Sequence, residues 1–455
     1  MNHTETRQLG FFSLAALLVS AHYGLGFVLG TAEKALTLGW AGSLYPISIA
    51  LGTLILLAFA RFYWRSVEPI WTLLGNRYGH PVKVLVGTMS WLSLIGIFAV
   101  QIIAGAFILK VLNVPVQPSM LGLALVFLLS SLLPIEKASW LFRGLLGFNI
   151  LALLYAIAKL HAVPLYLHAP VDFIPALHQM SLPSLLGISL STVLLVLIDM
   201  KYHQFVVQAK DLRNLYLGCI LAAILFLFLA LLPSAVVIAS QRAGILPTDI
   251  DGKEIIPWIL LWLGGGATQW GGQLLILSLI VPALGVGSSI LRVQTKVVLD
   301  FELIPASQLN RLLVSIINTG LGLAVALKGG EIISLIVLFY ALYVATVWVP
   351  FAAYLVAETG RYKFAASSVR LALIISGLSA LSMLILTLTK PDAAFFHSAE
   401  LSIIMLGMGF GCLGLGLGEI IEKYLPISTI KEDRHNHLST QHPQQLKTPT
   451  LTQKN

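Results

Sequence analysis

The chain has 455 residues, of which 57% are hydrophobic and 11% are charged. Soluble domains carry roughly a quarter of charged residues, so this composition excludes a soluble protein and indicates a polytopic membrane protein with one membrane domain. The formal net charge of +8 reflects basic loops and does not argue for nucleic-acid binding. The two cysteines, Cys219 and Cys412, lie in apolar segments and cannot form a disulfide framework or a metal cluster.

The hydrophobic pattern predicts an all-α protein with about twelve membrane spans, because a helix needs about 20 apolar residues to cross a bilayer. No small-residue cleavage site follows the polar residues 1–8, so the first span is kept as a membrane helix. The predicted spans are residues 9–30, 43–63, 84–112, 119–135, 141–162, 184–205, 213–240, 271–299, 309–328, 331–356, 366–389 and 398–422. We expect a membrane domain over residues 1–425 and a disordered cytoplasmic tail over 426–455.

The orientation follows from Lys and Arg, which are enriched in cytoplasmic loops. With the N-terminus in the cytoplasm, 21 of the 28 basic residues fall on the cytoplasmic side. The other 7 are Lys34, Lys110, Lys159, Arg242, Lys253, Lys328 and Lys390. We therefore expect a multi-pass protein of the cell (inner) membrane with both termini in the cytoplasm.

The first span contains the segment Ser20–Gly30, in which His22 is followed by Gly24 and Gly26. Glycine destabilises helices, and an imidazole in hydrocarbon is costly without a partner. One interpretation is a helix interrupted at mid-membrane, whose free backbone groups bind a ligand. The other is a kinked helix packed closely on a neighbour, with His22 hydrogen-bonded inside the bundle.

Three connections between the spans are long enough to carry structure of their own. Residues 65–79 are predicted to form an amphipathic helix on the cytoplasmic surface, anchored by Trp71. The outer loops 163–183 and 241–270 could form an outer gate or be passive connections.

Few ionisable residues lie within the spans, and no motif for ATP hydrolysis, metalloprotease or nucleophilic chemistry occurs, so neither an enzyme nor a cofactor is predicted. Asp199 follows the apolar stretch Leu194–Ile198 of the sixth span. It is either a solvated helix end near the cytoplasmic interface or a carboxylate in a cavity that binds a cation or carries a proton. The other ionisable residues of interest are His22, Lys201, His203 and Arg292.

Several motifs, in their order and spacing, resemble the sodium:solute symporter family. Residues 27–39, then Gly52 and then the Arg77-Tyr78-Gly79 motif resemble the opening of that family. The opening comprises a glycine-containing break, a glycine-bearing second helix and a cytoplasmic helix that ends in Arg-Tyr-Gly. The resemblance extends over about residues 9–350, which is most of the membrane domain.

Three further stretches carry the same resemblance. Residues 204–211 resemble the motif that leads into the seventh core helix, although Phe205 and Gln208 depart from it. Residues 281–300 resemble the eighth core helix, and Gln101 fits the third.

The resemblance implies a LeuT-like architecture, with spans 1–5 and 6–10 as inverted repeats and spans 11 and 12 appended. Substrate and ions would bind at mid-membrane, where the first and sixth core helices are broken. The residues expected to bind substrate are Ser20, Ala21, His22, Gly24, Gly26, Phe27, Ser191, Thr192 and Asp199.

The sodium site that the resemblance implies departs from the pattern of the family, which uses carbonyls of the first core helix and two adjacent hydroxyls on the eighth. At the hydroxyl positions this chain has Leu284 and Gly285, and Leu132–Pro134 replace a Tyr and Gly-Gly motif expected after the fourth helix. The ion-site positions are Ser20, Tyr23, Val281, Leu284, Gly285 and, if the helix is shifted by one turn, Ser288.

The sequence therefore predicts a secondary transporter that moves a small organic solute across the inner membrane by alternating access. The coupling ion is Na⁺ at an atypical site, or H⁺ through His22 or Asp199, since histidine titrates near neutral pH. The alternative is a non-transporting membrane sensor or partner subunit. Signalling would then need another protein, because the tail is too short for a kinase domain. The sequence names neither the solute nor the oligomeric state.

Overall fold

The computed structural model describes residues 7–66, 68–132 and 135–424, and for residues 135–146, 200, 201, 204, 281, 282 and 391 it describes the backbone only. The predicted tail 426–455 and the departures at Leu133 and Pro134 lie outside the described residues. Every regular element within the described ranges is a helix, apart from one isolated bridge between Leu9 and Ala209.

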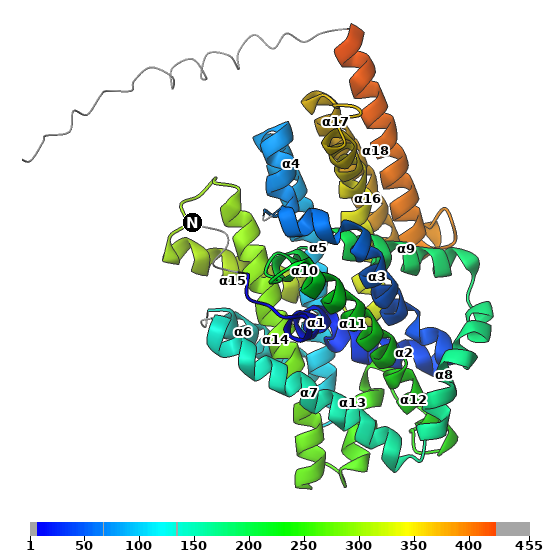
Figure 1. Ribbon diagram of the computed structural model, residues 1–455. Helices are drawn as coiled ribbons and strands as arrows, with labels where there is room; N and C mark the ends of the chain where they lie inside the picture. Colours follow the sequence, from blue (N-terminus) through cyan, green and yellow to red (C-terminus); the bar gives the residue numbers. More distant parts are fainter. Residues whose placement is uncertain (1–6, 67, 133–134, 425–455) are drawn as a thin grey trace, which may run out of the picture.

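The first part of the described chain folds into eight α-helices and two short 3-10 helices (Figure 1). They are α1 (Phe11–His22), α2 (Leu25–Leu38), η1 (Gly39–Ser43), α3 (Leu44–Arg65), α4 (Ile70–Tyr78), α5 (His80–Lys110), α6 (Val116–Ser131), α7 (Ile135–Lys159), α8 (Val163–Ala176) and η2 (Leu177–Gln179). The predicted first span is thus divided into α1 and α2, whereas α7 and α8 form a pair bent by 103°.

The remaining described chain adds ten α-helices and two 3-10 helices. They are α9 (Leu182–Ile198), α10 (Met200–Val206), α11 (Leu212–Ala230), α12 (Leu232–Arg242), η3 (Gly252–Glu254), α13 (Ile255–Leu263), α14 (Trp270–Asp300), α15 (Gln308–Lys328), α16 (Ile332–Glu358), α17 (Ala366–Thr389), η4 (Pro391–Ala393) and α18 (Ala399–Tyr424). The predicted sixth span is divided into α9 and α10.

The protein is an all-helical, multi-pass membrane protein. Within the described residues, 8 helical segments are long and apolar enough to cross a membrane, or 9 if the bent pair α7–α8 is one span. Helices α1, α6 and α9 are apolar but shorter. Every predicted span therefore coincides with helical structure, while length and composition alone yield fewer spans than the predicted twelve.

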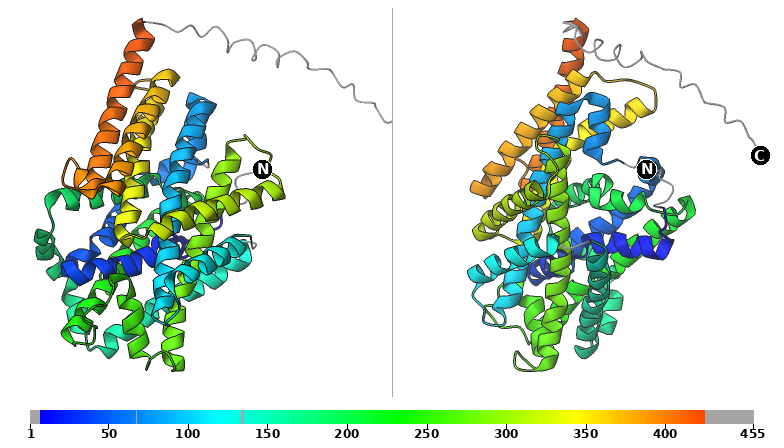
Figure 2. Two further views of the ribbon diagram at one scale, coloured as in Figure 1. Left: turned by 180° about the vertical axis from the view of Figure 1, so that it is seen from behind. Right: turned by 90° about the vertical axis from the view of Figure 1, so that its left-hand side faces the viewer.

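Helices α5 and α16 form the centre of the bundle, and both are apolar around most of their circumference, as expected for a buried helix. Helix α16 packs against α2, α5, α9, α17 and α18. Close approach to α5 depends on Gly96, because a Cβ atom there would lie 2.0 Å from the Phe339 ring. Helices α17 and α18 lie side by side at the edge of the bundle (Figure 2).

The predicted amphipathic helix exists as α4, but the expectation that Trp71 anchors it at a lipid surface is wrong. The indole is 1% exposed, and its Nε1 atom donates a hydrogen bond to Asp300 Oδ2 at 3.2 Å. Arg77 pairs with Glu358, so α4 is joined to both α14 and α16. We call the end of the molecule that carries α4 the Arg77 end, and the opposite end, which carries α12 and α13, the Lys34 end (Figure 1).

Candidate functional site

The first interruption, which we call break 1, consists of Tyr23 and Gly24 between α1 and α2. Gly24 is extended (φ −119°, ψ −169°), and its amide donates to the His22 carbonyl at 2.8 Å instead of continuing the helical pattern. A Cβ atom on Gly24 would lie 3.1 Å from Val286 Cγ2 and 3.5 Å from Gln101 Oε1. The interruption predicted from the glycines is therefore confirmed, and Gly24 allows α5 and α14 to approach the backbone closely.

The second interruption, break 2, is the single residue Asp199 between α9 and α10. Its backbone is extended (φ −75°, ψ 121°), so the last carbonyls of α9 lose their helical partners. The Tyr63 hydroxyl donates to one of them, the Leu197 carbonyl, and Trp348 Nε1 donates to the Leu194 carbonyl one turn earlier at 3.0 Å. Break 2 is thus stabilised by donors from α3 and α16.

A buried ion pair joins the two breaks. His22 Nε2 lies 3.1 Å from Asp199 Oδ2, and the two side chains are 1% and 8% exposed. The interpretation of Asp199 as a solvated helix end is therefore wrong. The His22 ring lies 4.8 Å from the ring of Tyr202, whose hydroxyl shares a 3.0 Å hydrogen bond with Thr53. Because a buried carboxylate is costly without a partner, this pair holds the ends of α1 and α9 together.

Neutral amides surround break 1. The Tyr23 hydroxyl donates to Asn149 Oδ1 at 3.0 Å, and the Asn149 Nδ2 atom makes no hydrogen bond within the described residues. The Gln101 side chain is 2% exposed, and its Oε1 atom makes none there either. Buried polar atoms usually have hydrogen-bond partners. The acceptor Gln101 Oε1 and the donor Asn149 Nδ2 are therefore available to a ligand beside the interrupted backbone.

The other predicted substrate residues divide between the breaks and the packing core. The hydroxyls of Ser20 and Ser191 donate to their own helices, at Leu17 and Gly187. Thr192 is buried two turns before break 2, and its hydroxyl makes no hydrogen bond within the described chain.

Three more of these residues line α1 and α2 around break 1. Gly26 faces Ile336, and Phe27 stacks against Tyr23 at 5.0 Å between ring centroids. Ala21 is partly buried at the end of α1.

Among the described side chains, those nearest Gly24 are Val286 and Gln101, and neither carries a hydroxyl. The α14 side chain that faces Gly24 is the aliphatic Val286. Leu284 and Gly285 are partly buried, and the Ser288 hydroxyl donates to the Gly285 carbonyl at 3.2 Å. Val281 lies in α14, with its side chain outside the described residues.

Two cavities of different size occur in the described part of the structure. The larger, of about 380 Å³, is at the Lys34 end and includes Tyr45, Ile188, Ser334 and Glu400, but neither His22 nor Asp199. The smaller, of about 20 Å³, contains Asp199. The smaller cavity is the one of the two that reaches Asp199.

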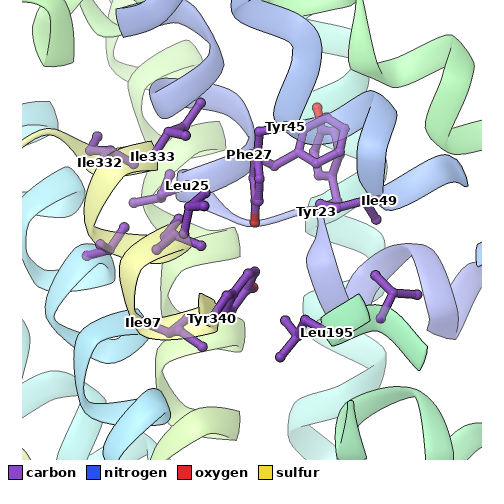
Figure 3. Packing of buried hydrophobic residues seen from close by; sticks show 14 of the residues in the cluster. Tyr23, Leu25, Phe27, Tyr45, Ile49, Ile97, Leu195, Ile332, Ile333 and Tyr340 are labelled. Atoms are coloured by element: carbon purple, nitrogen blue, oxygen red, sulfur yellow. The ribbon is translucent and has the colours of Figure 1, made fainter. Parts of the chain in front are cut away.

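Tyr45, which lines the larger cavity, lies next to Tyr340 of α16. The rings of Tyr45 and Tyr340 are 6.4 Å apart between centroids. Figure 3 shows Tyr340 of α16 opposite Leu195 of α9, with Phe27 and Tyr45 beside them.

Several residues of the site were missed by sequence reasoning. Asn149 could have been found, because a lone amide in an apolar span is unusual. Tyr63, Tyr202 and Trp348 carried no such signal, because aromatic residues in a membrane helix are ordinary core or interface residues.

The fold is similar to those of three solved transporter structures. A Na⁺-coupled sialic acid symporter in a substrate-bound outward-open state matches with a TM-score of 0.64 and 15% identity, over 92% of this chain and 90% of that chain. Mhp1, a nucleobase-cation-symport-1 family transporter, matches with a TM-score of 0.56 and 13% identity, over 91% and 94%. A manganese transporter of Eremococcus coleocola matches with a TM-score of 0.52 and 14% identity, over 90% and 95%.

No protein-family model matches the chain, and no curated protein matches it in sequence. The structural matches show that the protein has the LeuT-like fold of cation-coupled secondary transporters, and these neighbours are transporters and not enzymes.

Proposed function

We propose that the protein is a secondary active transporter, a divergent relative of the sodium:solute symporters, that moves a small organic solute across the inner membrane by alternating access. One observation carries the proposal: a buried His22–Asp199 pair joins two interrupted helices in a LeuT-like fold. Transporters of this kind bind substrate and ions where discontinuous helices expose backbone groups at mid-membrane.

The membrane topology that we propose has twelve spans, with α1–α2 and α9–α10 each counted as one broken span and α6 as a short one. The two broken spans then begin the two halves of a five-plus-five inverted repeat, and α17 and α18 are appended. We place both termini in the cytoplasm, because the basic loops gather at the Arg77 end. The membrane domain covers residues 1–425, and the tail 426–455 is cytoplasmic.

The solute is proposed to bind at break 1. The backbone of Tyr23 and Gly24 is non-helical there, and Gln101 and Asn149 offer amide atoms. Because His22 and Asp199 compensate each other's charge when both are ionised, a solute of low net charge fits better than a strongly charged one.

Proton coupling through the ion pair is favoured over sodium coupling. Sodium is a hard cation that prefers several oxygen ligands, and this chain has Leu284 and Gly285 at the α14 positions where the family has hydroxyls. The α14 side chain nearest Gly24 is the aliphatic Val286. A histidine–carboxylate pair can exchange a proton near neutral pH. The outcome expected for a proton-coupled protein is uptake that depends on pH, and that loses this dependence in His22→Ala.

The first test is thermal stability of the purified protein in sodium, potassium and choline, each with a panel of amino acids, sugars and nucleobases. A ligand at a hundredfold excess over its Kd stabilises the folded state by about 2.7 kcal/mol. We expect one solute class to raise Tm equally in all three salts, and to drive uptake into proteoliposomes. A sodium-specific rise would reject proton coupling. No solute effect together with a stably co-purifying protein would favour the non-transporting sensor instead.

A further inference from the structure

The smaller cavity brings polar side chains other than His22 close to Asp199. Its polar lining consists of Ser90, Ser93, Tyr343 and Asp199, contributed by α5, α16 and break 2. Apolar side chains such as Leu195 and Val293 complete it. The Tyr343 residue is 3% exposed, and its hydroxyl faces Ser90 without a direct hydrogen bond of ordinary geometry.

The cavity has the size and chemistry of a site for one water molecule. A buried water needs about 10–15 Å³ and two to four polar partners, and this cavity offers about 20 Å³ and four polar side chains. The Ser93 hydroxyl donates to the Ser90 carbonyl at 2.8 Å, so its oxygen is left to accept. A water here would satisfy the Tyr343 hydroxyl, which otherwise bears the cost of burial without a partner.

The polar side chains that α5 contributes to the cavity come from the half of this helix nearer the Arg77 end. Ser90 and Ser93 belong to the half of α5 that begins at His80, next to α4. At 1.5 Å per residue, Ser90 is about 15 Å along the helix from His80 and about twice as far from Lys110. Toward the Lys34 end, Tyr45 lines the larger cavity, and its ring lies 6.4 Å from that of Tyr340.

We propose that this cavity binds one water molecule, and that this water is the proton-exchange partner of Asp199 on the Arg77 side. The inference rests on the proposed proton-coupled transport. Protonated Asp199 transfers its proton to the water, which becomes hydronium and passes the proton toward the Arg77 end. The carboxylate that remains is stabilised by His22, while the hydroxyls of Ser90, Ser93 and Tyr343 orient the water.

The described titratable groups around the carboxylate come from several elements. They are His22 of α1, Tyr202 of α10, and Tyr340 and Tyr343 of α16, with Tyr45 and Cys219 close to Tyr202. Histidine is the only side-chain type among them whose ordinary pKa lies near neutral pH. A second buried histidine, His203 of α10, has its ring hydrogen-bonded to the Ser66 carbonyl at 2.7 Å.

The test compares three variants and one control variant of the full-length protein in nanodiscs by pH-dependent infrared difference spectroscopy. Asp199→Asn identifies the carbonyl band of protonated Asp199. Tyr343→Phe removes one partner of the water, and Ser93→Val fills the cavity. We expect both changes to shift the Asp199 band to higher frequency, because the carboxyl group loses a hydrogen-bond partner. Thr346→Val, which removes a buried hydroxyl from the same helix next to α17, is the matched control and is expected to leave the band unchanged.

Transport provides the second readout. In proteoliposomes, Tyr343→Phe and Ser93→Val are expected to slow proton-coupled uptake by about tenfold, the effect of one lost hydrogen bond, while solute-induced thermal stabilisation is retained. An identical Asp199 band and uptake rate in both variants and the control would overturn the water site and leave proton coupling intact. A wild-type spectrum without any band that Asp199→Asn removes would reject proton coupling itself.

Discussion

The two helix breaks lie side by side but are made in different ways. Break 1 contains a glycine, and close packing of Val286 and Gln101 against Gly24 holds the backbone there. Break 2 contains neither glycine nor proline, and none occurs between Gly187 and Gly218. Its backbone is instead stabilised by Tyr63 and Trp348, which donate hydrogen bonds to the carbonyls of α9.

This difference shows that an interrupted helix can arise from a local preference or from its neighbours. Glycine lowers the cost of non-helical backbone at break 1. At break 2 the cost is offset by donors from α3 and α16 and by the ion pair with His22. Break 1 is therefore expected to respond to steric changes, and break 2 to the loss of polar partners.

The largest effect is expected from separating the ion pair that joins the breaks. His22→Ala leaves the Asp199 carboxylate buried without its imidazole, and removal of one partner of a buried pair costs about 3–5 kcal/mol. We expect a large fall in Tm and, in the protein that stays folded, uptake that no longer depends on pH. The double variant His22→Ala/Asp199→Ala should recover part of the stability without transport. Equal stability of the single variant and the wild type would show that the pair does not join the breaks.

A smaller effect is expected from adding a methyl group at break 1. Gly24→Ala places a Cβ atom 3.1 Å from Val286 Cγ2, and overpacking of this kind costs about 1–3 kcal/mol. Gly122→Ala on α6 is the control, because a Cβ there meets nothing within 4 Å and alanine favours the helix. Thermal unfolding should rank Gly24→Ala below the wild type and Gly122→Ala at or above it. The reverse order would contradict a steric origin of break 1.

Removal of a single carbonyl partner at break 2 is expected to cost about 1 kcal/mol. Tyr63→Phe keeps the ring and removes the hydroxyl that donates to the Leu197 carbonyl. Tyr155→Phe, at a residue that is 40% exposed, is the matched control. Chemical denaturation in a fixed detergent would measure the difference. A Tyr63→Phe variant as stable as the Tyr155→Phe control would mean that break 2 does not depend on this donor.

The smallest effect is expected from the loops, away from both breaks. Although burial opposes ionisation of Glu331, hydrogen bonds from Lys34 and Ser334 leave its pKa lowered. The Asn214 amide lowers the pKa of Asp211, and Lys83 lowers that of Glu302.

A carboxyl whose folded pKa lies below its unfolded value stabilises the protein above the unfolded pKa, and this stabilisation is lost as the pH falls through the folded pKa. Tm should therefore decline modestly below about pH 4. Glu331→Gln is expected to weaken that decline. A steeper decline in this variant would contradict the conclusion that ionised Glu331 stabilises the folded protein.

Much of the helical structure could be predicted, because a bilayer forces the backbone of each apolar run to form its own hydrogen bonds. The position of break 1 followed from Gly24 and Gly26. The role of Trp71 was predicted wrongly, because an amphipathic pattern does not distinguish a lipid surface from the Asp300 side chain that accepts the indole hydrogen bond.

The candidate site was predicted only in part. Sequence reasoning singled out His22 and Asp199 as unusual ionisable residues, but not that they contact each other. Asn149 and Tyr63 have hydrogen-bond partners far away in the chain, and no local sequence pattern predicts such a contact.

The amino-acid sequence by itself determined a polytopic helical membrane protein whose first span is either interrupted or kinked at its glycines, because hydrophobic run length and glycine act locally. Only the tertiary structure decided that α9 ends at Ile198, that Asp199 is buried against His22 and that a water-sized cavity touches its carboxylate. Those features depend on contacts between side chains of α1, α3, α5 and α16 at the same depth in the bundle. Packing between distant segments of the chain determines such contacts.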